Sequence, residues 1–288
     1  MKIYGYGRQN ITNEDVDAVI AVLRSDFLSQ GPQIKEFEDA ICGYTGAKYC
    51  VAVANGTAAL HLSMMALGVG PGDEVITTPI TFMASANCVG YVGGTVKFAD
   101  VDPRTANIDP QEMAKRITPR TKAVIPVHYA GQSCDMEAIE NLAKKRGIFV
   151  VEDASHAIGS DYKGLKVGCC AHSDMTVFSF HPVKNMTTGE GGAIATNSRE
   201  LYEKLLLLRS HGMIKNDPQL TDVHGKWFCE MHSPGFNYRM TDLQAALGIS
   251  QLKRIEKFKE RRRQMAALYR KIFADDSRIS FLEEMEYS

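Results

Sequence analysis

Short runs of β-branched residues alternate with helical segments along most of this 288-residue chain, and this alternation constrains its fold more than any other feature. Strands separated by helices are joined by crossover connections, which make neighbouring strands parallel. Helices cover both faces of such a sheet. The sequence therefore predicts an α/β fold with a mostly parallel sheet sandwiched by helices. We expect strands at 49–54, 74–79, 95–100, 122–127, 148–153, 175–180 and 191–196, and helices at 57–67, 81–91, 135–146 and 198–209.

Helical patterns flank this alternating region at both ends. Thr12 and Asp15 have the spacing of a capping box before a first amphipathic helix, and a second helix follows Pro32. After Met240, apolar residues at helical spacing predict one long helix that continues to Phe273.

The domain organisation follows from these patterns. No long linker divides residues 1–240, which we expect to form a large domain with an N-terminal helical segment. Residues 241–288 would then hold the long helix and the start of a smaller domain. The strand-like RISFLEE at 278–284 would have an unpaired edge, so we expect the smaller domain to be incomplete, as in a truncated product.

Charge and hydropathy limit the partners of the chain. The formal net charge is −1, which provides no basic field for a nucleic acid or an anionic membrane. The basic run at 257–263 is most simply the solvated face of a helix. Since no apolar stretch is long enough to span a bilayer, we expect no membrane partner and a small neutral or anionic ligand instead.

The cysteines indicate a reducing compartment. There are seven, an odd number, without C-x-x-C spacing, which is typical of free thiols in a cytoplasmic protein. Cys169, Cys170 and His172 could in principle bind a metal, but we expect none there because further ligands at a paired spacing are absent. The N-terminal residues also lack the apolar segment of a secretion signal.

A glycine-containing loop after the first expected strand is a candidate phosphate site. Asn55 and Gly56 precede Thr57 at the start of a helix, where free backbone N–H groups and a hydroxyl can hold a phosphate. An ordinary capped helix start has the same pattern, so this signal is weak by itself.

A carboxylate follows the fifth expected strand. Asp153 ends a buried apolar run, and a buried carboxylate requires a charged or hydrogen-bonding partner. Asp153 could instead cap the next segment, and His156 could be a satisfied polar residue of the loop. If neither alternative holds, the acid faces a cation at this edge of the sheet.

A lysine follows the next strand, at another point of the same edge. Lys184 lies after Ser179 in SFHPVKNMTTGEGG, where it could be an ordinary solvated charge. Ligands of parallel sheets bind at the carboxyl ends of the strands, where this lysine would meet Asp153 and the loop at Thr57. Together these groups describe a pyridoxal 5'-phosphate site. The lysine would form an imine with the aldehyde, the acid would pair with the ring nitrogen, and the helix start would hold the phosphate.

Motifs along nearly the whole chain support this interpretation. They are YGRQNI, SDFLSQGP, NGTAALHL, TPITFMASANCVGYVGG, VEDASHAIGS, SFHPVKNMTTGEGG and GFNYRMTDLQAALGISQL. In these motifs the chain resembles the DegT/DnrJ/EryC1/StrS family of sugar-nucleotide aminotransferases, which are fold type I pyridoxal-phosphate enzymes. Within that family it is most similar to the transaminases of pseudaminic acid biosynthesis.

The resemblance implies a role for each matching residue. Lys184 corresponds to the Schiff-base lysine, Asp153 to the partner of the ring nitrogen, and His156 to a residue beside the ring. The other implied cofactor contacts are Thr57, Ala58 and Ser179 at the phosphate, Phe82 stacked on the ring, and Asn237, which reaches the phosphate of the neighbouring subunit.

The resemblance also implies the reaction. It suggests a homodimer with shared active sites that moves an amino group from L-glutamate to C4 of a UDP-linked 4-keto-6-deoxy-N-acetylhexosamine. Three alternatives remain: an aminotransferase for another keto sugar, a truncated module that binds the cofactor without activity, and a sugar 3-dehydratase. In the dehydratases a histidine replaces the lysine, so Lys184 favours amino transfer.

Overall fold

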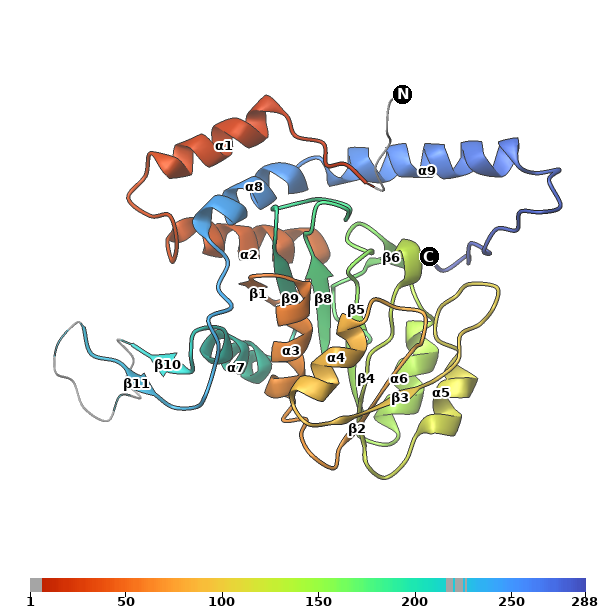
Figure 1. The fold of residues 1–288 in the computed structure, drawn as a ribbon, viewed down its shortest axis with the longest axis horizontal. Coiled ribbons are helices and arrows are strands. Elements are labelled where there is room, and N and C mark those ends of the chain that lie inside the picture. Colours follow the sequence, from red (N-terminus) through yellow and green to blue (C-terminus); the bar gives the residue numbers. More distant parts are fainter. Residues whose placement is uncertain (1–6, 216–219, 221–224, 226) are drawn as a thin grey trace.

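A seven-stranded sheet forms the centre of the computed structural model, which describes residues 7–215, 220, 225 and 227–288 (Figure 1). Its strand order is β1-β9-β8-β5-β4-β2-β3. β9 is antiparallel to both of its neighbours, whereas the other pairs are parallel, which confirms the mostly parallel α/β fold. The strands are β1 (Tyr49–Val53), β2 (Glu74–Thr77), β3 (Thr95–Phe98), β4 (Thr121–Val124), β5 (Phe149–Asp153), β8 (Met175–Ser179) and β9 (Gly192–Thr196).

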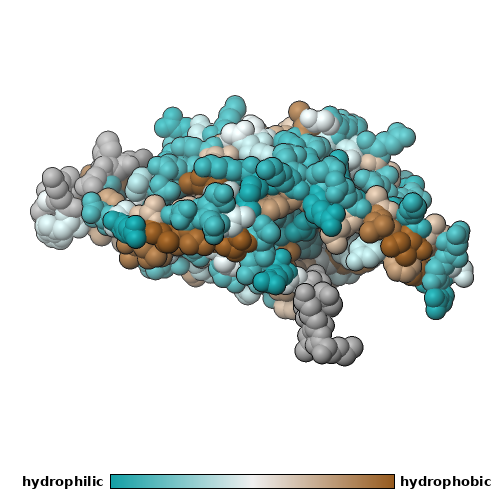
Figure 2. Space-filling view, turned by 90° about the horizontal axis from the view of Figure 1, so that it is seen from above, coloured by the Kyte–Doolittle hydropathy of each residue, from teal (hydrophilic) through white to brown (hydrophobic). Residues whose placement is uncertain are grey.

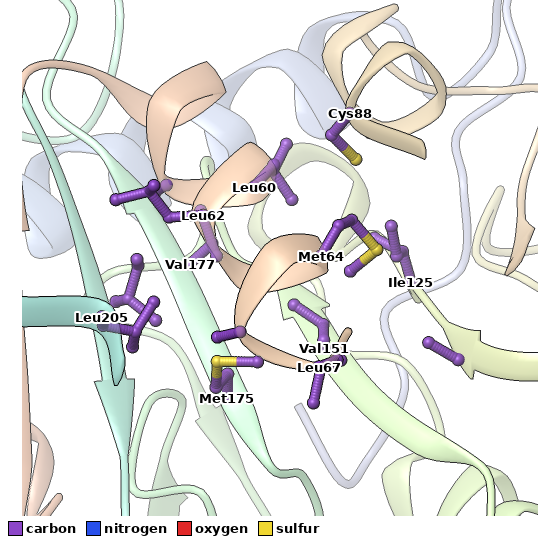
Figure 3. Packing of buried hydrophobic residues seen from close by; sticks show 14 of the residues in the cluster. Leu60, Leu62, Met64, Leu67, Cys88, Ile125, Val151, Met175, Val177 and Leu205 are labelled. Carbon is purple, nitrogen blue, oxygen red and sulfur yellow. The ribbon is translucent and has the colours of Figure 1, made fainter. Parts of the chain in front are cut away.

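Helices pack on both faces of the sheet because successive strand residues point to opposite sides. On one face, Val151 and Val177 pack with Leu60 and Leu205 beneath α3 (Gly56–Ala66), α4 (Ala84–Tyr91) and α7 (Arg199–Arg209) (Figure 3). On the other face, Phe178 packs beneath α2 and α8, and Val150 packs against the side of α6. The helices on this second face are α2 (Pro32–Thr45), α5 (Pro110–Arg116), α6 (Met136–Lys144) and α8 (Asp242–Leu252).

The first helix, α1 (Asn13–Leu23), begins with the expected capping box of Thr12 and Asp15 and packs on α8. The single long helix expected after Met240 is wrong, because α8 ends at Leu252 and α9 (Ile255–Ile272) begins after a turn. Arg254 lies at this break with φ −111° and ψ 6°, and its guanidinium forms an ion pair with the fully buried carboxylate of Asp15. The ion pair neutralises this carboxylate and joins the break between α8 and α9 to the first turn of α1.

The C-terminal segment returns to the sheet domain. RISFLEE, expected as a strand, forms none; Glu283 instead donates its N–H to the carbonyl of Arg104 at 2.8 Å. Gln132 Nε2 donates to the Glu283 carbonyl at 3.0 Å. Groups of Arg104 and Gln132 therefore satisfy both backbone polar groups of Glu283 without strand pairing.

Several short elements had no sequence signal long enough to predict them. Besides α5, they are the 3-10 turn η1 (Tyr129–Gly131) and the two-residue strands β6 (Asp161–Tyr162), β7 (Leu165–Lys166), β10 (Met213–Ile214) and β11 (Glu230–Met231).

Hydrophobic residues form bands on an otherwise hydrophilic face of the molecule, seen from above in Figure 2. In the part of the chain that the structure describes, none of the helices is long and apolar enough to cross a membrane.

Candidate active site

The carboxylate of Asp153, at the carboxyl end of β5, is the centre of the candidate site. Asp153 is only 5% exposed, and its two oxygens accept hydrogen bonds from different elements. The Ser155 N–H and hydroxyl donate to Oδ1 at 3.1 and 2.6 Å, and the Ser85 hydroxyl donates to Oδ2 at 2.6 Å. The bonds from Ser155 are local, as a capping role predicts, but the bond from Ser85 joins residues 68 positions apart. These donors hold the carboxylate in one orientation and leave lone pairs available for a ligand.

Ser85 is a residue that the sequence analysis missed. It is fully buried in the first turn of α4, and its oxygen lies 2.7 Å from the hydroxyl of Thr81. Because an ionised carboxylate only accepts hydrogen bonds, Ser85 donates to Asp153 and Thr81 must donate to Ser85. The sequence feature that could have identified Ser85 is the pair of hydroxyl residues in TFMAS, Thr81 and Ser85. This motif comes just after a buried strand, at the same edge of the sheet as Asp153.

The strand pleat decides which acid reaches this site. Glu152, the preceding residue, points to the opposite face, where it accepts hydrogen bonds from Ser173 at 2.5 Å and Thr176 at 2.8 Å. His128 Nε2 lies 2.7 Å from the same carboxylate, while its Nδ1 accepts the Cys134 N–H at 3.1 Å. Glu152 is therefore satisfied inside the protein, and only Asp153 is available at the active-site edge.

Lys184 lies in the loop after β8, and its side chain is half-buried. The loop turns sharply there, with the N–H of Lys184 donating to the carbonyl of His181 at 2.9 Å. Burial lowers the pKa of the Lys184 amine below its usual value, although the negative charge of Asp153 opposes this shift. A lowered pKa raises the neutral, nucleophilic fraction of the amine, as covalent catalysis by lysine requires.

His156 is the third titratable group of this cluster. Burial is the largest cause that lowers its pKa, followed by the positive charge of Lys184, whereas Asp153 raises it. Asp153 and His156, predicted from one motif, and Lys184, predicted from another, are therefore close enough to influence one another's charge. We expect the His156 ring to be neutral near pH 7, so that it can donate or accept a hydrogen bond.

The start of α3 provides the expected place for a phosphate. The Asn55 side chain caps the helix by accepting the N–H of Ala58 at 2.8 Å, so this N–H, one of the expected phosphate ligands, is already used. A Cβ atom on Gly56 would lie 2.9 Å from the Cβ of Ser179, which shows how closely β8 approaches the helix start. Among the described residues, the hydroxyls of Ser179 and Thr57 have no hydrogen-bond partner. These groups fit a bound phosphate.

The remaining two predicted contacts lie at the surface. The side chain of Phe82 is 66% exposed, and its carbonyl accepts the N–H of Ser85 at 3.2 Å, so it lies next to the residue that positions Asp153. Asn237 is also exposed, and its backbone pairs with Ser210. The next residue, Tyr238, accepts the N–H of Ala54 at 2.8 Å, beside the capped start of α3.

A lysine with a lowered pKa, a buried carboxylate and a phosphate-type helix start at one edge of an α/β sheet define a pyridoxal-phosphate transferase of fold type I. Residues 9–286 match the model of the "DegT/DnrJ/EryC1/StrS aminotransferase family", and the chain belongs to this family. It is a pyridoxal-phosphate-dependent sugar aminotransferase. The residues described above fit that cofactor.

Two relatives illustrate the similarity in sequence. The chain is 46% identical over 268 residues to the spore coat polysaccharide biosynthesis protein SpsC of Bacillus subtilis, covering 93% of this chain and 68% of that protein. It is 40% identical over 285 residues to the UDP-4-amino-4,6-dideoxy-N-acetyl-beta-L-altrosamine transaminase of Campylobacter jejuni, covering 98% of this chain and 73% of that enzyme.

Two solved structures illustrate the similarity in fold. Helicobacter pylori PseC, an aminotransferase involved in the biosynthesis of pseudoaminic acid, superposes with a TM-score of 0.88 at 39% identity, covering 96% of this chain and 72% of that one. The putative sugar aminotransferase Spr1654 of Streptococcus pneumoniae, in its PMP form, has a TM-score of 0.89 at 33% identity, covering 95% and 73%.

Proposed function

We propose that this enzyme transfers the amino group of L-glutamate to C4 of a UDP-4-keto-6-deoxy-N-acetylhexosamine, as in pseudaminic acid biosynthesis. The observation that carries the proposal is the half-buried amine of Lys184, whose pKa is lowered within the electrostatic reach of Asp153. The similarity to the altrosamine transaminase and to PseC supports the choice of sugar.

The residues of the site have separate tasks in this proposal. Pyridoxal phosphate, when bound, supplies an aldehyde that takes up the amino group and a ring that accepts electrons. Asp153 would keep the ring nitrogen protonated, Ser179 and Thr57 would bind the phosphate, and Ala58 would add to that contact if Asn55 yields its N–H. Phe82 and His156 would contact the ring.

Lys184 has two tasks. With the cofactor bound, its neutral amine would hold the aldehyde, and it would move protons to and from the reacting carbon as a general base and acid. Burial helps both tasks, because it disfavours the ammonium form.

We further propose a cytoplasmic homodimer in which Asn237 of each subunit reaches the phosphate of its partner. The exposure of the Asn237 side chain is compatible with that role. We also propose that residues 1–240 form the cofactor-binding domain and that residues 241–288 begin the smaller one.

A second candidate is amino transfer to another 4-keto nucleotide sugar. The chain is 44% identical over 254 residues to the GDP-perosamine synthase of Caulobacter vibrioides, and an enzyme of that kind would need a different nucleotide.

The two half-reactions test the proposal. L-glutamate should convert the bound cofactor to its pyridoxamine form, and only the correct keto-sugar nucleotide should convert it back. NMR of the product would identify the nucleotide and the configuration at C4 and C5. Failure to form the pyridoxamine from any amino acid would contradict the proposed function.

A further inference from the structure

The buried pair of His128 and Glu152 lies next to Asp153 in the sheet and has no part in the chemistry proposed above. His128 is fully buried, and Glu152 belongs to the same buried region. Nε2 of the histidine donates to Oε2 of Glu152 at 2.7 Å, because Nδ1 already accepts the Cys134 N–H. Both nitrogens of the ring are therefore occupied, and the ring has a single orientation.

The Glu152 carboxylate joins three neighbouring strands. It lies on β5, which has β4 on one side and β8 on the other (Figure 1). One oxygen contacts His128, which follows β4, and the other accepts hydrogen bonds from Ser173 and from Thr176 on β8. Thr176 is also the residue of β8 that stands in register with Glu152. The carboxylate thus connects β4 and β8 to β5, one residue before Asp153.

The main chain of Asp153 is bonded to the segment that carries the histidine. The His128 N–H donates to the Asp153 carbonyl at 3.1 Å, and the Asp153 N–H donates to the Pro126 carbonyl at 2.9 Å. Both partners follow the last residue of β4. The backbone of Asp153 therefore depends on the position of residues 126–128, and the His128 side chain fixes these residues to Glu152.

The turn after His128 also reaches the loop of His156. This turn is η1, in which Gly131 has φ 95° and donates its N–H to the His128 carbonyl at 3.1 Å. A Cβ atom on Gly131 would lie 3.0 Å from the His156 carbonyl, and the Ser160 hydroxyl donates to the Gly131 carbonyl at 2.6 Å. A displacement of His128 would therefore disturb the backbone at both Asp153 and His156.

We propose that His128 and Glu152 are positioning residues that fix Asp153 relative to the cofactor ring. Glu152 points to the opposite face of the sheet from Asp153, so the pair acts through the main chain of Asp153 and not by contact with the ring. Ser85 bonds the Asp153 carboxylate directly and is a separate support. This inference rests on the proposed function, in which Asp153 holds the ring nitrogen.

Titration of the cofactor-depleted full chain with pyridoxal phosphate tests this role without the sugar substrate. His128→Phe keeps a ring at this position but cannot donate to Glu152. It should raise the Kd for the cofactor about tenfold and shift the pH midpoint of the absorption of the bound cofactor, because a misplaced Asp153 holds the ring nitrogen less well. His128→Gln can still donate an N–H to Glu152 and should keep both values within about twofold of wild type.

Thr118→Val is the matched control, because it also removes one donor from a buried strand carboxylate. Thr118 donates to Glu74 at 2.6 Å, and Glu74 is the first residue of β2, at the amino end of the strand. This substitution should lower the free energy of unfolding but leave the Kd and the pH midpoint within about twofold of wild type. If His128→Phe does not fold, the double variant His128→Phe, Glu152→Met takes its place, since it leaves no unpaired buried carboxylate.

Three results would overturn the proposal. The first is a wild-type Kd and pH midpoint in His128→Phe or in the double variant despite a loss of stability, which would make the pair only structural. The second is an equal shift in Thr118→Val, and the third is a shift in His128→Gln as large as in His128→Phe. A wild-type protein whose cofactor binding depends on His128, but which transfers no amino group, would contradict the proposed function and not this positioning role.

Discussion

The hydroxyl of Ser85 donates a 2.6 Å hydrogen bond to Oδ2 of Asp153, which joins the first turn of α4 to the end of β5. Ser85 is fully buried and also contacts the Thr81 hydroxyl, so its own orientation is constrained. The acid proposed to hold the ring nitrogen is thus positioned by a separate helix.

Ser85→Ala should lower kcat about tenfold with little change in the KM values, because Asp153 would lose the donor that orients it. The pH at which the absorption of the bound cofactor changes should also shift. Ser63→Ala is the matched control, since Ser63 is another fully buried hydroxyl, bonded to the Ala59 carbonyl at 2.8 Å. Equal effects of both substitutions on stability, with an unchanged cofactor spectrum, would show that Ser85 is only structural.

Lys184→Ala should abolish covalent attachment of the cofactor and amino transfer together, because no other amine is expected to reach the aldehyde. Mass spectrometry after borohydride reduction would detect the attachment, with the exposed Lys48→Ala as control. Cofactor still fixed at the active site of the Lys184 variant would disprove the assignment.

Asp153→Ala should retain some cofactor but reduce turnover about 100-fold or more, as loss of a charged hydrogen bond to the ring nitrogen predicts. The assay should be run with saturating cofactor so that weaker binding does not explain the loss. Near-normal turnover would mean that Asp153 only caps the segment that contains Ser155.

A shared active site can be tested by mixing two inactive variants, Lys184→Ala and Asn237→Ala. In a dimer one hybrid site would contain both native residues, so reassociated mixtures should recover part of the activity. Native mass measurement would confirm that mixed dimers formed. Mixed dimers without recovered activity would contradict a site completed by Asn237.

Asp15→Asn should destabilise the protein near pH 7 by about 3 kcal/mol, because it leaves the half-buried Arg254 guanidinium without its counter-charge. Burial raises the pKa of Asp15, but hydrogen bonds from Ser250, Thr12 and Gln251 and the charge of Arg254 together lower it. A lowered pKa means that this stabilisation is present above the pKa of the unfolded state, about 4, and is lost as the pH falls below it. Urea unfolding should therefore show a smaller difference between variant and wild type at pH 3 than at pH 7, with the exposed Asp17→Asn unchanged.

The sheet could be predicted because its signal is local. Each of the seven expected strands is present to within a few residues, since a short run of β-branched and apolar residues favours a strand whatever its neighbours are. The ion pair at the break between α8 and α9 could not be predicted, because Arg254 and the buried Asp15 are 239 residues apart in the chain. The pattern of apolar residues continues across the break and contains no sign of it.

The sequence alone determined the alternating fold, the residue types of the site and the edge of the sheet where Asp153, Lys184 and the start of α3 meet. These features follow from hydrophobic periodicity and from the rule that parallel strands end at one edge. Only the tertiary structure decided that Ser85 orients Asp153, that Asn55 uses the Ala58 N–H, and that Arg254 pairs with Asp15. Such pairings depend on distances between elements that are remote in sequence, and those distances are set by how the helices pack on the sheet.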